Sequence, residues 1–394
     1  MTIAPVPSPI PVPVVESLIA HTRALGQAPW LSTTEGTLSY VDLARALEDN
    51  TSSHTDTLHH GDQPIQDYVL SLLRSAAYGQ SLRIGHGPAE DMSQGALYLS
   101  TSGSTGQARW VTHHWSDWWK QYPLRRARHS GAMAWLMAPD HIGGLHTLFY
   151  ALSRGIHLVR VEPSHIDDLR IAMVQHRIQT LPTTPAHLFG LWQAGFFDQV
   201  WPHLRLITYG AEAMAPALRD QIAALQPQVR WKETYGSTEA GILPMASGQQ
   251  PGVWKPLFPW KLKGQDLWVQ APNGAWIATG DRAEAMLEGT LRYLGRHQDR
   301  IKVGGVLVDP LITLNALRDD SSVLQASVST PDHPMMGKVV EADLWLHSEV
   351  DSLAWEQSTR KRLSTLLEAP YRPVRYRFHQ NSAMNTRLKS SIPQ

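Results

Sequence analysis

The middle of the chain alternates short apolar runs with longer segments of helical spacing. The short runs cover residues 96–100, 134–139, 156–161, 178–183, 204–210 and 229–236. Between them, as in 165–176 and 216–225, apolar residues recur every three or four positions, which is the spacing of an amphipathic helix. Strands that alternate with helices predict a mostly parallel α/β sheet.

The two ends of the chain follow other patterns. Residues 15–95 predict helices joined by polar loops, with one long loop at 51–64. After about residue 245, short β-like segments between glycine-bearing turns predict a small antiparallel or barrel-like element. From about His297, strands and two helical segments, 310–319 and 353–368, predict a separate α+β domain of about 100 residues.

The composition narrows the class of protein. The chain has 394 residues, which suggests two or three domains at about 150 residues each. Lysine plus arginine and aspartate plus glutamate both total 35, so the net charge is zero and no global field favours nucleic acid or an anionic membrane. The chain contains no cysteine, which excludes disulfides, thiolate metal sites and a cysteine nucleophile.

The first 18 residues resemble a targeting segment only superficially. Prolines interrupt every apolar run there, and the basic residues that begin a signal peptide are missing. We therefore expect an extended, polyproline-like arm. No apolar run approaches 18 residues, so we expect no membrane-spanning helix and a cytoplasmic protein.

The sharpest local feature is a glycine- and hydroxyl-rich loop after the run 96–100. Its glycines allow close backbone approach, and successive N–H groups can surround an anion, which suits the phosphates of a nucleotide. It is not a Walker A loop, because no Gly-Lys-Ser/Thr follows. Taken alone, it also fits an ordinary turn. Its residues are Thr101, Ser102, Gly103, Ser104, Thr105 and Gly106.

Three further pieces carry chemistry that suits a nucleotide. The run Tyr235–Glu239 ends a predicted strand and offers an aromatic ring, a hydroxyl and a carboxylate that can bind Mg²⁺. Asp281 follows Thr279 and Gly280 in a predicted turn, where it can accept hydrogen bonds from ribose hydroxyls. Arg296 can hold a phosphate or a ribose. Each piece alone also fits a plain turn or a solvated charge.

The order of these pieces resembles the adenylate-forming superfamily, which includes acyl-CoA synthetases, aryl-acid ligases, luciferases and the adenylation domains of peptide synthetases. The resemblance covers about Ala96 to the C-terminus, some three quarters of the chain. The matching stretches are LSTSGSTGQARWVTHH, MAPDHIGGLHTL, LPTTPAHL, ITYGAEAM, ETYGSTEAGIL, ATGD and LGRHQDRIKVGGVLV.

The resemblance implies an α/β fold. A large N-terminal domain of layered α/β sheets plus a small β-barrel would span 1–294, a hinge 295–298, and a small mobile α+β domain 299–394. It also implies a ligase that uses ATP and Mg²⁺. A carboxylate attacks the α-phosphate to give an acyl-adenylate and pyrophosphate. A second nucleophile, usually the thiol of CoA or of carrier-protein phosphopantetheine, then displaces AMP.

The resemblance also implies roles for single residues. The Thr101–Gly106 loop would hold the β- and γ-phosphates, and Thr238 would contact the α-phosphate. Glu239 would bind Mg²⁺. His141 would lie beside the acid and gate the thiol tunnel. The nucleotide would also contact Arg109, Gly210, Ala211, Glu212, Tyr235, Gly236, Asp281 and Arg296, with Tyr235 stacked on adenine and Asp281 and Arg296 on the ribose. Pantetheine would pass close to Gly304 and Gly305.

The chain departs from the family pattern in four places. The phosphate loop usually ends in Pro-Lys, whereas here it ends in Ala108-Arg109, which keeps the cation. The hinge position holds Gln298 instead of Asp or Lys. The terminal adenylation lysine lacks its usual glycine, so Lys389 or Arg387 would take that role, with Lys389 favoured. The part before the phosphate loop is short, which predicts a trimmed first subdomain.

The acid and the acceptor follow less directly. Members that activate amino acids carry Asp where this chain has His141, which favours an acid without an α-amino group. The expected pocket is apolar and suits an aryl or medium acyl acid. It would be formed by 141–147 with Gly143 and Gly144, by 181–185 with Thr184, by Ala211 and by 240–244 with Gly241. Two alternatives stay open: an enzyme that stops at the adenylate or passes it to an amine, and a nucleotide-binding protein without catalysis.

Overall fold

The computed structural model describes residues 13–49, 56–85, 93–102, 108–125, 131–212, 214–243, 245–246, 253–271, 274–296 and 299–379. The expected N-terminal arm lies largely outside these residues, as do the centre of the phosphate loop and the hinge position. In the described part of the chain, no helix is long and apolar enough to cross a membrane.

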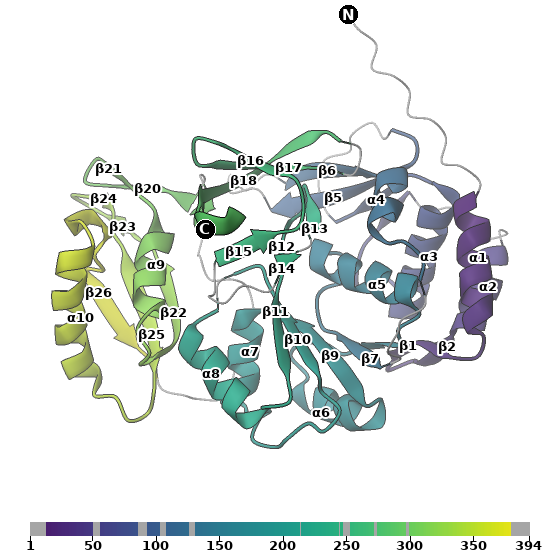
Figure 1. Cartoon of the computed structure of the whole chain (residues 1–394), viewed down its shortest axis with the longest axis horizontal. Coiled ribbons are helices and arrows are strands. Elements are labelled where there is room, and N and C mark those ends of the chain that lie inside the picture. Colours follow the sequence, from purple (N-terminus) through teal and green to yellow (C-terminus); the bar gives the residue numbers. More distant parts are fainter. Residues whose placement is uncertain are drawn as a thin grey trace, which may run out of the picture.

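A seven-stranded sheet forms the lower half of the molecule (Figure 1). Its strands are parallel except for the β1–β2 hairpin, so the predicted parallel α/β sheet is confirmed. In spatial order they are β11 (Arg230–Glu233), β10 (Leu206–Tyr209), β9 (Ile178–Thr183), β7 (Ala132–Trp135), β8 (Leu158–Arg160), β1 (Pro29–Thr33) and β2 (Gly36–Ser39).

Strand β7 shows how the sheet is covered on both faces. Successive side chains of a strand point to opposite faces. Met133 and Trp135 belong to one buried cluster, whereas Ala132 and Ala134 belong to another. The first cluster includes residues of α1 (Pro13–Leu25), α2 (Tyr40–Glu48), α3 (Ile65–Tyr78), α4 (Trp115–Gln121) and α5 (Ile142–Arg154), and the second those of α6 (Ile166–Gln175), α7 (Pro185–Gln193) and α8 (Pro216–Leu225).

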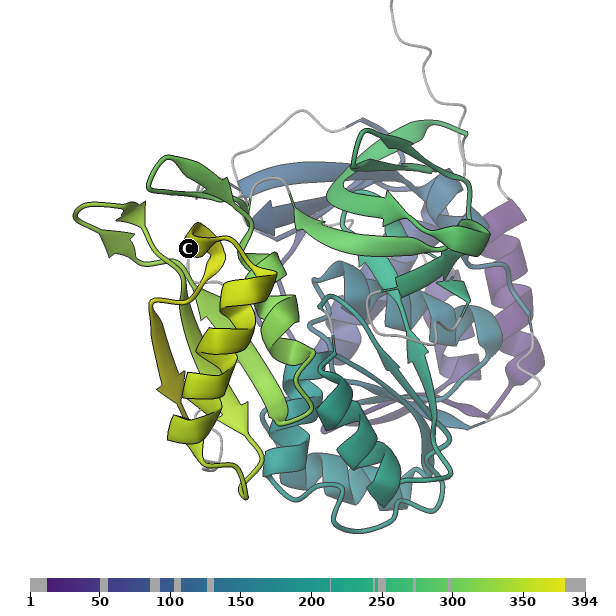
Figure 2. The same cartoon turned by 60° about the vertical axis from the view of Figure 1, so that its left-hand side comes forward.

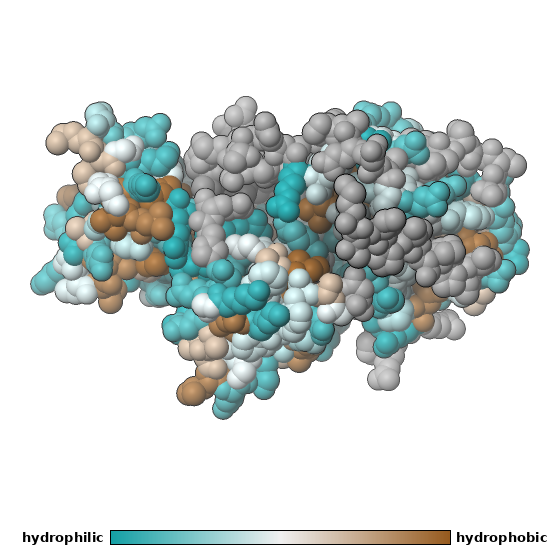
Figure 3. All heavy atoms as spheres, turned by 90° about the horizontal axis from the view of Figure 1, so that it is seen from above, coloured by the Kyte–Doolittle hydropathy of each residue, from teal (hydrophilic) through white to brown (hydrophobic). Residues whose placement is uncertain are grey.

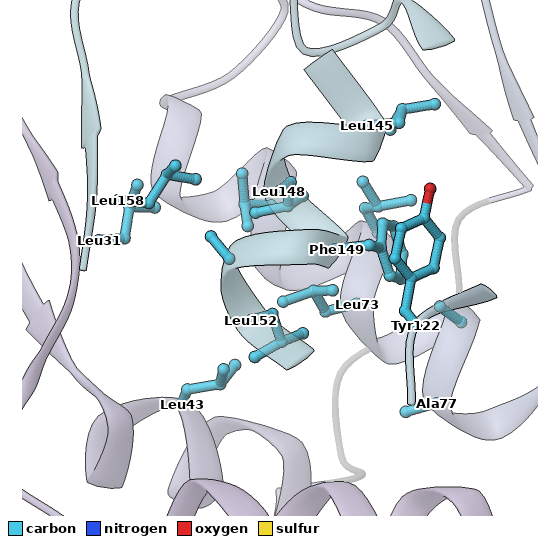
Figure 4. Packing of buried hydrophobic residues seen from close by; sticks show 14 of the residues in the cluster. Leu31, Leu43, Leu73, Ala77, Tyr122, Leu145, Leu148, Phe149, Leu152 and Leu158 are labelled. Atoms are coloured by element: carbon cyan, nitrogen blue, oxygen red, sulfur yellow. The ribbon is translucent and has the colours of Figure 1, made fainter. Parts of the chain in front are cut away.

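Helix α5 lies at the centre of the first cluster (Figure 4). Its buried residues Leu145, Leu148, Phe149 and Leu152 recur at positions i, i+3, i+4 and i+7, which places them on one helix face. This face packs among side chains of the sheet and of the N-terminal helices, such as Leu31, Leu158, Leu43 and Leu73. The helix that begins at the expected acid pocket is therefore held by a dry core.

The expectation of helices alone in residues 15–95 is wrong. Besides three helices, this part contributes β1 and β2 to the large sheet and two strands to a second sheet. The second sheet has the order β3 (Thr57–Leu58), β4 (Leu82–Ile84), β5 (Ala96–Ser102) and β6 (Ala108–His114). The four strands from this part, β1 to β4, have two to five residues and few consecutive apolar positions, so they leave no clear apolar run in the sequence.

A six-stranded antiparallel sheet follows, as the glycine-rich pattern after residue 245 predicts. Its order is β14 (Met245–Ala246), β15 (Val253–Pro256), β19 (Leu291–Arg296), β18 (Trp276–Ala285), β17 (Asp266–Gln270) and β16 (Trp260–Lys263), with the short 3₁₀ turn Leu287–Gly289 between β18 and β19. The predicted turn at Thr279–Asp281 is wrong, because these residues lie inside β18. Gly280 has a φ of +77°, and the pairing register shifts on both sides of it, so the segment that resembles a turn is an irregular strand.

The last segment has its own buried cluster, which includes Val303, Val328, Leu344 and Trp355. Its strands are β20 (Ile301–Val303), β21 (Val306–Val308), β22 (Val323–Ser329), β23 (Asp332–His333), β24 (Gly337–Lys338), β25 (Glu341–Leu346) and β26 (Arg375–Phe378); its helices are α9 (Pro310–Arg318), α10 (Ser352–Leu366) and the 3₁₀ turn Ala369–Tyr371. We call residues 299–379 the C-terminal segment. It lies beside α7 and α8 (Figures 1 and 2), where the Phe189 and Trp345 rings are 5.6 Å apart.

Candidate active site

The Tyr235–Glu239 motif forms a hairpin. The predicted single strand 229–236 is interrupted at Thr234: β11 ends at Glu233, and β12 (Tyr235–Ser237) then pairs antiparallel with β13 (Gly241–Leu243). Thr238, Glu239 and Ala240 form the turn between them, and the Ser237 hydroxyl accepts a hydrogen bond from the Ala240 N–H. The hydroxyl and carboxylate expected at the α-phosphate and Mg²⁺ therefore stand at the tip of one hairpin.

A buried carboxylate lies next to this hairpin. Asp281 is 2% exposed, and it accepts hydrogen bonds from the Tyr235 hydroxyl and from Arg296 Nε at 3.0 Å. Burial raises the pKa of Asp281, and the neighbouring Arg296 charge opposes that rise. The charge of Glu239 acts on both Asp281 and Arg296. The fold thus brings together Tyr235, Glu239, Asp281 and Arg296, which come from three different sequence motifs.

Tyr235 is held on one side by a neighbour that the sequence did not assign. Its ring lies 4.5 Å from the Trp254 ring, at an interplanar angle of 34°. Burial and the Asp281 charge raise the pKa of the Tyr235 hydroxyl, so this hydroxyl stays a donor to Asp281. Trp254 belongs to the buried cluster of the small sheet.

The three residues after β10 have unusual backbone geometry. Gly210 approaches the neighbouring loop so closely that a Cβ there would lie 2.6 Å from the Thr234 carbonyl oxygen. Ala211 has a φ of +73°, a left-handed conformation that non-glycine residues rarely adopt. Glu212 accepts a hydrogen bond from the Ala186 N–H at 2.9 Å and forms an ion pair with Arg318 of α9. Strained backbone of this kind is common at ligand sites.

The residues expected at the acid pocket start two helices. His141 is exposed at the N-cap of α5, and Gly143 and Gly144 form the first turn of that helix. Thr184 is the N-cap of α7, and its hydroxyl accepts a hydrogen bond from the His187 N–H, so it has a capping role. Helix α5 packs against β13, which contains Gly241. Helix α5 and the Tyr235 hairpin are therefore neighbours.

The phosphate loop is described only at its two ends. Thr101 and Ser102 end β5, and they pair with Arg109 and Ala108 at the start of β6, so the loop closes a β-hairpin. Gly103, Ser104, Thr105 and Gly106 lie outside the described residues. The side chain of Arg109 is exposed.

Other expected residues lie in or beyond the C-terminal segment. Gly304 and Gly305 form the turn between β20 and β21, at the outer edge of this segment (Figure 1). Gln298, Arg387 and Lys389 lie outside the described residues, and so does the rest of the predicted hinge after Arg296.

Sequence reasoning missed two residues that touch the predicted site. Nε2 of His113 lies 2.7 Å from the Thr238 carbonyl oxygen, and Arg318 pairs with Glu212. His113 belongs to one of the matched stretches, and its position directly after the phosphate loop was an available signal. Arg318 lies in the predicted helix 310–319, and nothing in the sequence pairs it with a residue of another domain.

The donor set fits a magnesium nucleotide. Asp281 is a buried acceptor, Thr238 is a hydroxyl, Arg296 is a cation, and the close approach of Gly210 to Thr234 brings backbone together where the family pattern places adenine. Among the described residues, no group of three or more His, Asp or Glu side chains could hold a metal ion. Mg²⁺ is usually bound by one or two carboxylates plus substrate phosphates, so Glu239 with a nucleotide would suffice. These features are those of an α/β protein whose site suits a nucleotide.

A family model described as AMP-binding enzyme matches residues 28–262, more than half of the chain, so the chain belongs to the AMP-binding enzyme family. This confirms the predicted membership of the adenylate-forming superfamily. A curated relative, the 2-succinylbenzoate–CoA ligase of Bacillus velezensis, is 26% identical over 68% of this chain. The aligned part spans 62% of that relative's length, and 63 to 65% of two further Bacillus ligases of the same name.

Solved structures support the fold. The o-succinylbenzoate CoA synthetase of Bacillus subtilis, solved with the OSB-AMP acyl-adenylate, has a TM-score of 0.64 at 17% identity and covers 92% of this chain and 94% of its own. An anthranilate CoA ligase, solved with anthranoyl-AMP, has a TM-score of 0.69 at 14% identity and covers 95% of this chain and 94% of its own. The predicted α/β fold class is therefore confirmed.

Proposed function

We propose that this protein is an acid–thiol ligase that activates a carboxylic acid with ATP and transfers the acyl group to a thiol. In the first half-reaction, a carboxylate oxygen attacks the α-phosphorus of ATP, and acyl-adenylate and pyrophosphate form. In the second, a thiol of CoA or of a carrier-protein phosphopantetheine attacks the acyl carbon, AMP leaves and a proton is released. Neither step requires a protein nucleophile, which agrees with the lack of cysteine.

The buried Asp281 cluster carries this proposal. A carboxylate that is 2% exposed and held by Tyr235 and Arg296 is costly to bury, and it gains when a ligand adds hydrogen-bond donors. The two vicinal hydroxyls of a ribose supply such donors. The adjacent Tyr235–Glu239 hairpin then supplies a hydroxyl and a carboxylate on the side of the phosphates. Bound Mg²⁺ would neutralise charge on the phosphates, and Glu239 would hold it.

The remaining residues of the chain act by positioning. Fixed donors of the phosphate loop, Arg109 and Thr238 would stabilise charge that develops on the leaving pyrophosphate and at the α-phosphate. The start of α5 would orient the acid, with His141 beside its carboxylate. This division of roles is that of an electrostatic and positioning catalyst.

The acid that we propose is an aryl or medium acyl acid without an α-amino group. The expected pocket holds leucine, isoleucine, alanine and proline and has few charges, which suits an apolar acid. The names of the curated relatives, 2-succinylbenzoate–CoA ligases, support an aromatic acid and CoA as acceptor.

The surface of the C-terminal segment supports its role in the second half-reaction. Apolar residues flank the Gly304–Gly305 turn: Val306 is 42% exposed, Leu307 49% and Met335 88%. Seen from above, apolar surface is visible on this segment (Figure 3). We propose that residues 299–394 form a mobile domain that turns this surface towards the nucleotide site, with the hinge at 295–298.

A panel of carboxylic acids, scored by pyrophosphate release with ATP and Mg²⁺, tests the first half-reaction. Aryl acids should give signal above amino acids. AMP release that depends on added CoA, on a phosphopantetheinylated carrier protein or on an amine then identifies the acceptor. If none of the acids in the panel gives pyrophosphate release, the proposal is contradicted, and nucleotide binding without catalysis is favoured.

Single-turnover kinetics test the proposed domain movement. Lys389→Ala should slow adenylate formation and spare transfer from a pre-made acyl-adenylate. Arg387→Ala, measured in the same way, shows which of the two residues supplies the cation. Gln298→Pro should impede transfer more than adenylation, because a fixed φ restricts the hinge. Equal loss of both steps in all variants would contradict an alternation between two poses.

A further inference from the structure

One imidazole joins the two halves of the proposed nucleotide site. His113 lies in β6, the strand that leaves the phosphate loop, and its Nε2 lies 2.7 Å from the carbonyl oxygen of Thr238 in the hairpin turn. The two residues are far apart in sequence. This hydrogen bond is therefore a direct cross-link between β6, the strand that follows the phosphate loop, and the turn that contains Thr238 and Glu239.

The chemistry of the contact fixes the state of the ring. A carbonyl oxygen can only accept, so Nε2 of His113 must carry the hydrogen and donate it. Burial lowers the pKa of His113, although the Thr238 carbonyl and the Glu239 charge oppose this. The ring is thus a neutral donor at neutral pH, with its hydrogen on Nε2.

The ring is also fixed by packing. The His113 and Trp118 rings lie 5.3 Å apart in an edge-on arrangement, and Trp118 is in the core between α4 and α5. Helix α4 reaches the other end of the same turn, because a Cβ built on Gly241 would lie 2.9 Å from Oε1 of Gln121. The continuous unit β6–α4 therefore contacts the hairpin turn at both of its ends.

We propose that His113 is a positioning residue that sets the distance of Thr238 and Glu239 from the phosphate loop through its Nε2–H bond to the Thr238 carbonyl. Its partner is a backbone carbonyl, so it would act through the position of the turn and not on the reacting atoms. The proposal rests on the proposed ATP-dependent activation. Its effect should appear in the nucleotide and metal parameters, whereas the parameters for the acid should change little.

The experiment compares His113→Gln with His113→Met. Both side chains fill a similar volume, but only the glutamine amide nitrogen reaches the Nε2 position with a hydrogen to donate. His114→Met on the same strand is the matched control, since it removes the imidazole next to His113 and keeps the Nε2–H bond of His113 to Thr238. Pyrophosphate release is measured against MgATP, free Mg²⁺ and acid, and calorimetric binding of MgATP gives a readout without turnover.

We expect His113→Met to raise the concentrations of MgATP and of free Mg²⁺ needed for half-maximal activity by about tenfold, because one buried hydrogen bond is lost. The KM for the acid should stay within about twofold, and His113→Gln should restore most of the loss, because the backbone carbonyl regains its donor. The control should match the wild type. Thermal unfolding of each variant checks that the fold is intact.

Two outcomes would overturn the proposal. If His113→Met keeps wild-type dependence on MgATP and Mg²⁺, the bond does not position the turn. If His113→Gln loses as much as His113→Met, the ring acts by packing alone. An inactive wild type would instead contradict the proposed function, and the calorimetric comparison of the two variants would still test the positioning role.

Discussion

Oε2 of Glu212 and Nη2 of Arg318 lie 3.6 Å apart, and they join the loop after β10 to the end of α9. The other end of the same helix is held too: Asp309, its N-cap, accepts a hydrogen bond from Arg282, the neighbour of Asp281 in β18. Arg282, Asp309 and Arg318 are all buried. Helix α9 is thus fixed at both ends to residues adjacent to the proposed nucleotide site, and any movement of the C-terminal segment must break these pairs.

Arg318→Met should lower the free energy of unfolding by about 3 kcal/mol, because it leaves the Glu212 carboxylate without its buried partner. The double variant Glu212→Leu with Arg318→Met should recover much of this loss, since no unpaired charge remains. Urea unfolding of the four proteins gives the coupling energy.

The exposed pair of Arg219 and Asp220 is the control for this cycle. Arg219→Met should change the free energy of unfolding by less than about 1 kcal/mol, as is usual for surface ion pairs. A coupling energy near zero between Glu212 and Arg318 would mean that this pair does not hold α9.

Glu239→Gln should reduce acid-dependent pyrophosphate release by about 100-fold. The variant loses the carboxylate that would hold Mg²⁺, and with it the stabilisation of negative charge on the phosphates in the transition state. Glu284→Gln is a suitable control, since Glu284 is exposed and paired with Arg292 at 3.5 Å. Near wild-type pyrophosphate release from a folded Glu239→Gln protein would remove Glu239 from the metal site.

Asp281→Asn should weaken ATP binding by about 1.5–3 kcal/mol, the range for hydrogen bonds to charged groups. Asparagine keeps one acceptor oxygen for Arg296 Nε, and the Tyr235 hydroxyl can instead accept a hydrogen bond from the amide nitrogen, so the fold should persist. Calorimetry with ATP and with 2′-deoxy-ATP measures the effect. If the wild type binds both nucleotides equally well, the assignment of Asp281 to the ribose is wrong.

Stability should fall on acidification through His146. Burial lowers the pKa of His146 from 6.5 to about 4, and its Nδ1 contacts the Tyr122 hydroxyl. The pKa of His146 in the folded state is below its unfolded value. The contribution of the neutral ring to the free energy of unfolding is therefore complete above pH 6.5 and is lost as the pH falls towards 4. Between pH 7.5 and pH 5 it amounts to about 2 kcal/mol.

His146→Phe removes this titration, so its free energy of unfolding should vary less with pH than that of the wild type. The lost contact with Tyr122 shifts both ends of the range alike and does not affect the comparison. Urea unfolding at several pH values measures the two slopes, and parallel slopes would show that His146 does not titrate as described.

The sequence predicted those strands and helices that have a regular apolar spacing. Strand β9 and helix α8 have the predicted bounds, because their apolar spacing is regular and a proline starts α8. Strand β1 was missed because its sequence PWLST has only two adjacent apolar residues between a proline and two polar residues, so it forms no apolar run. The Thr279–Asp281 segment has the composition of a turn, but tertiary pairing makes it an irregular strand.

The residues of the candidate site that belong to recognisable motifs were predictable from the sequence. Tyr235, Asp281 and Arg296 were each assigned to the nucleotide, and the structure brings them into contact. The bonds that His113 and Arg318 make were not predictable, because one joins a side chain to a distant backbone carbonyl and the other joins the end of α9 to the loop after β10. Such bonds leave no spacing pattern in one sequence.

The strand β6 runs directly into α4, whose aromatic residues Trp115, Trp118 and Trp119 pack against Phe149 of α5. The strand that leaves the proposed phosphate loop and the helix that begins at the proposed acid pocket thus belong to one packed unit. For engineering, this means that acid preference and nucleotide affinity cannot be tuned separately through α5. Substitutions that enlarge the pocket by removing this aromatic packing should also weaken ATP binding. A second substitution that restores the lost side-chain volume nearby should prevent that weakening.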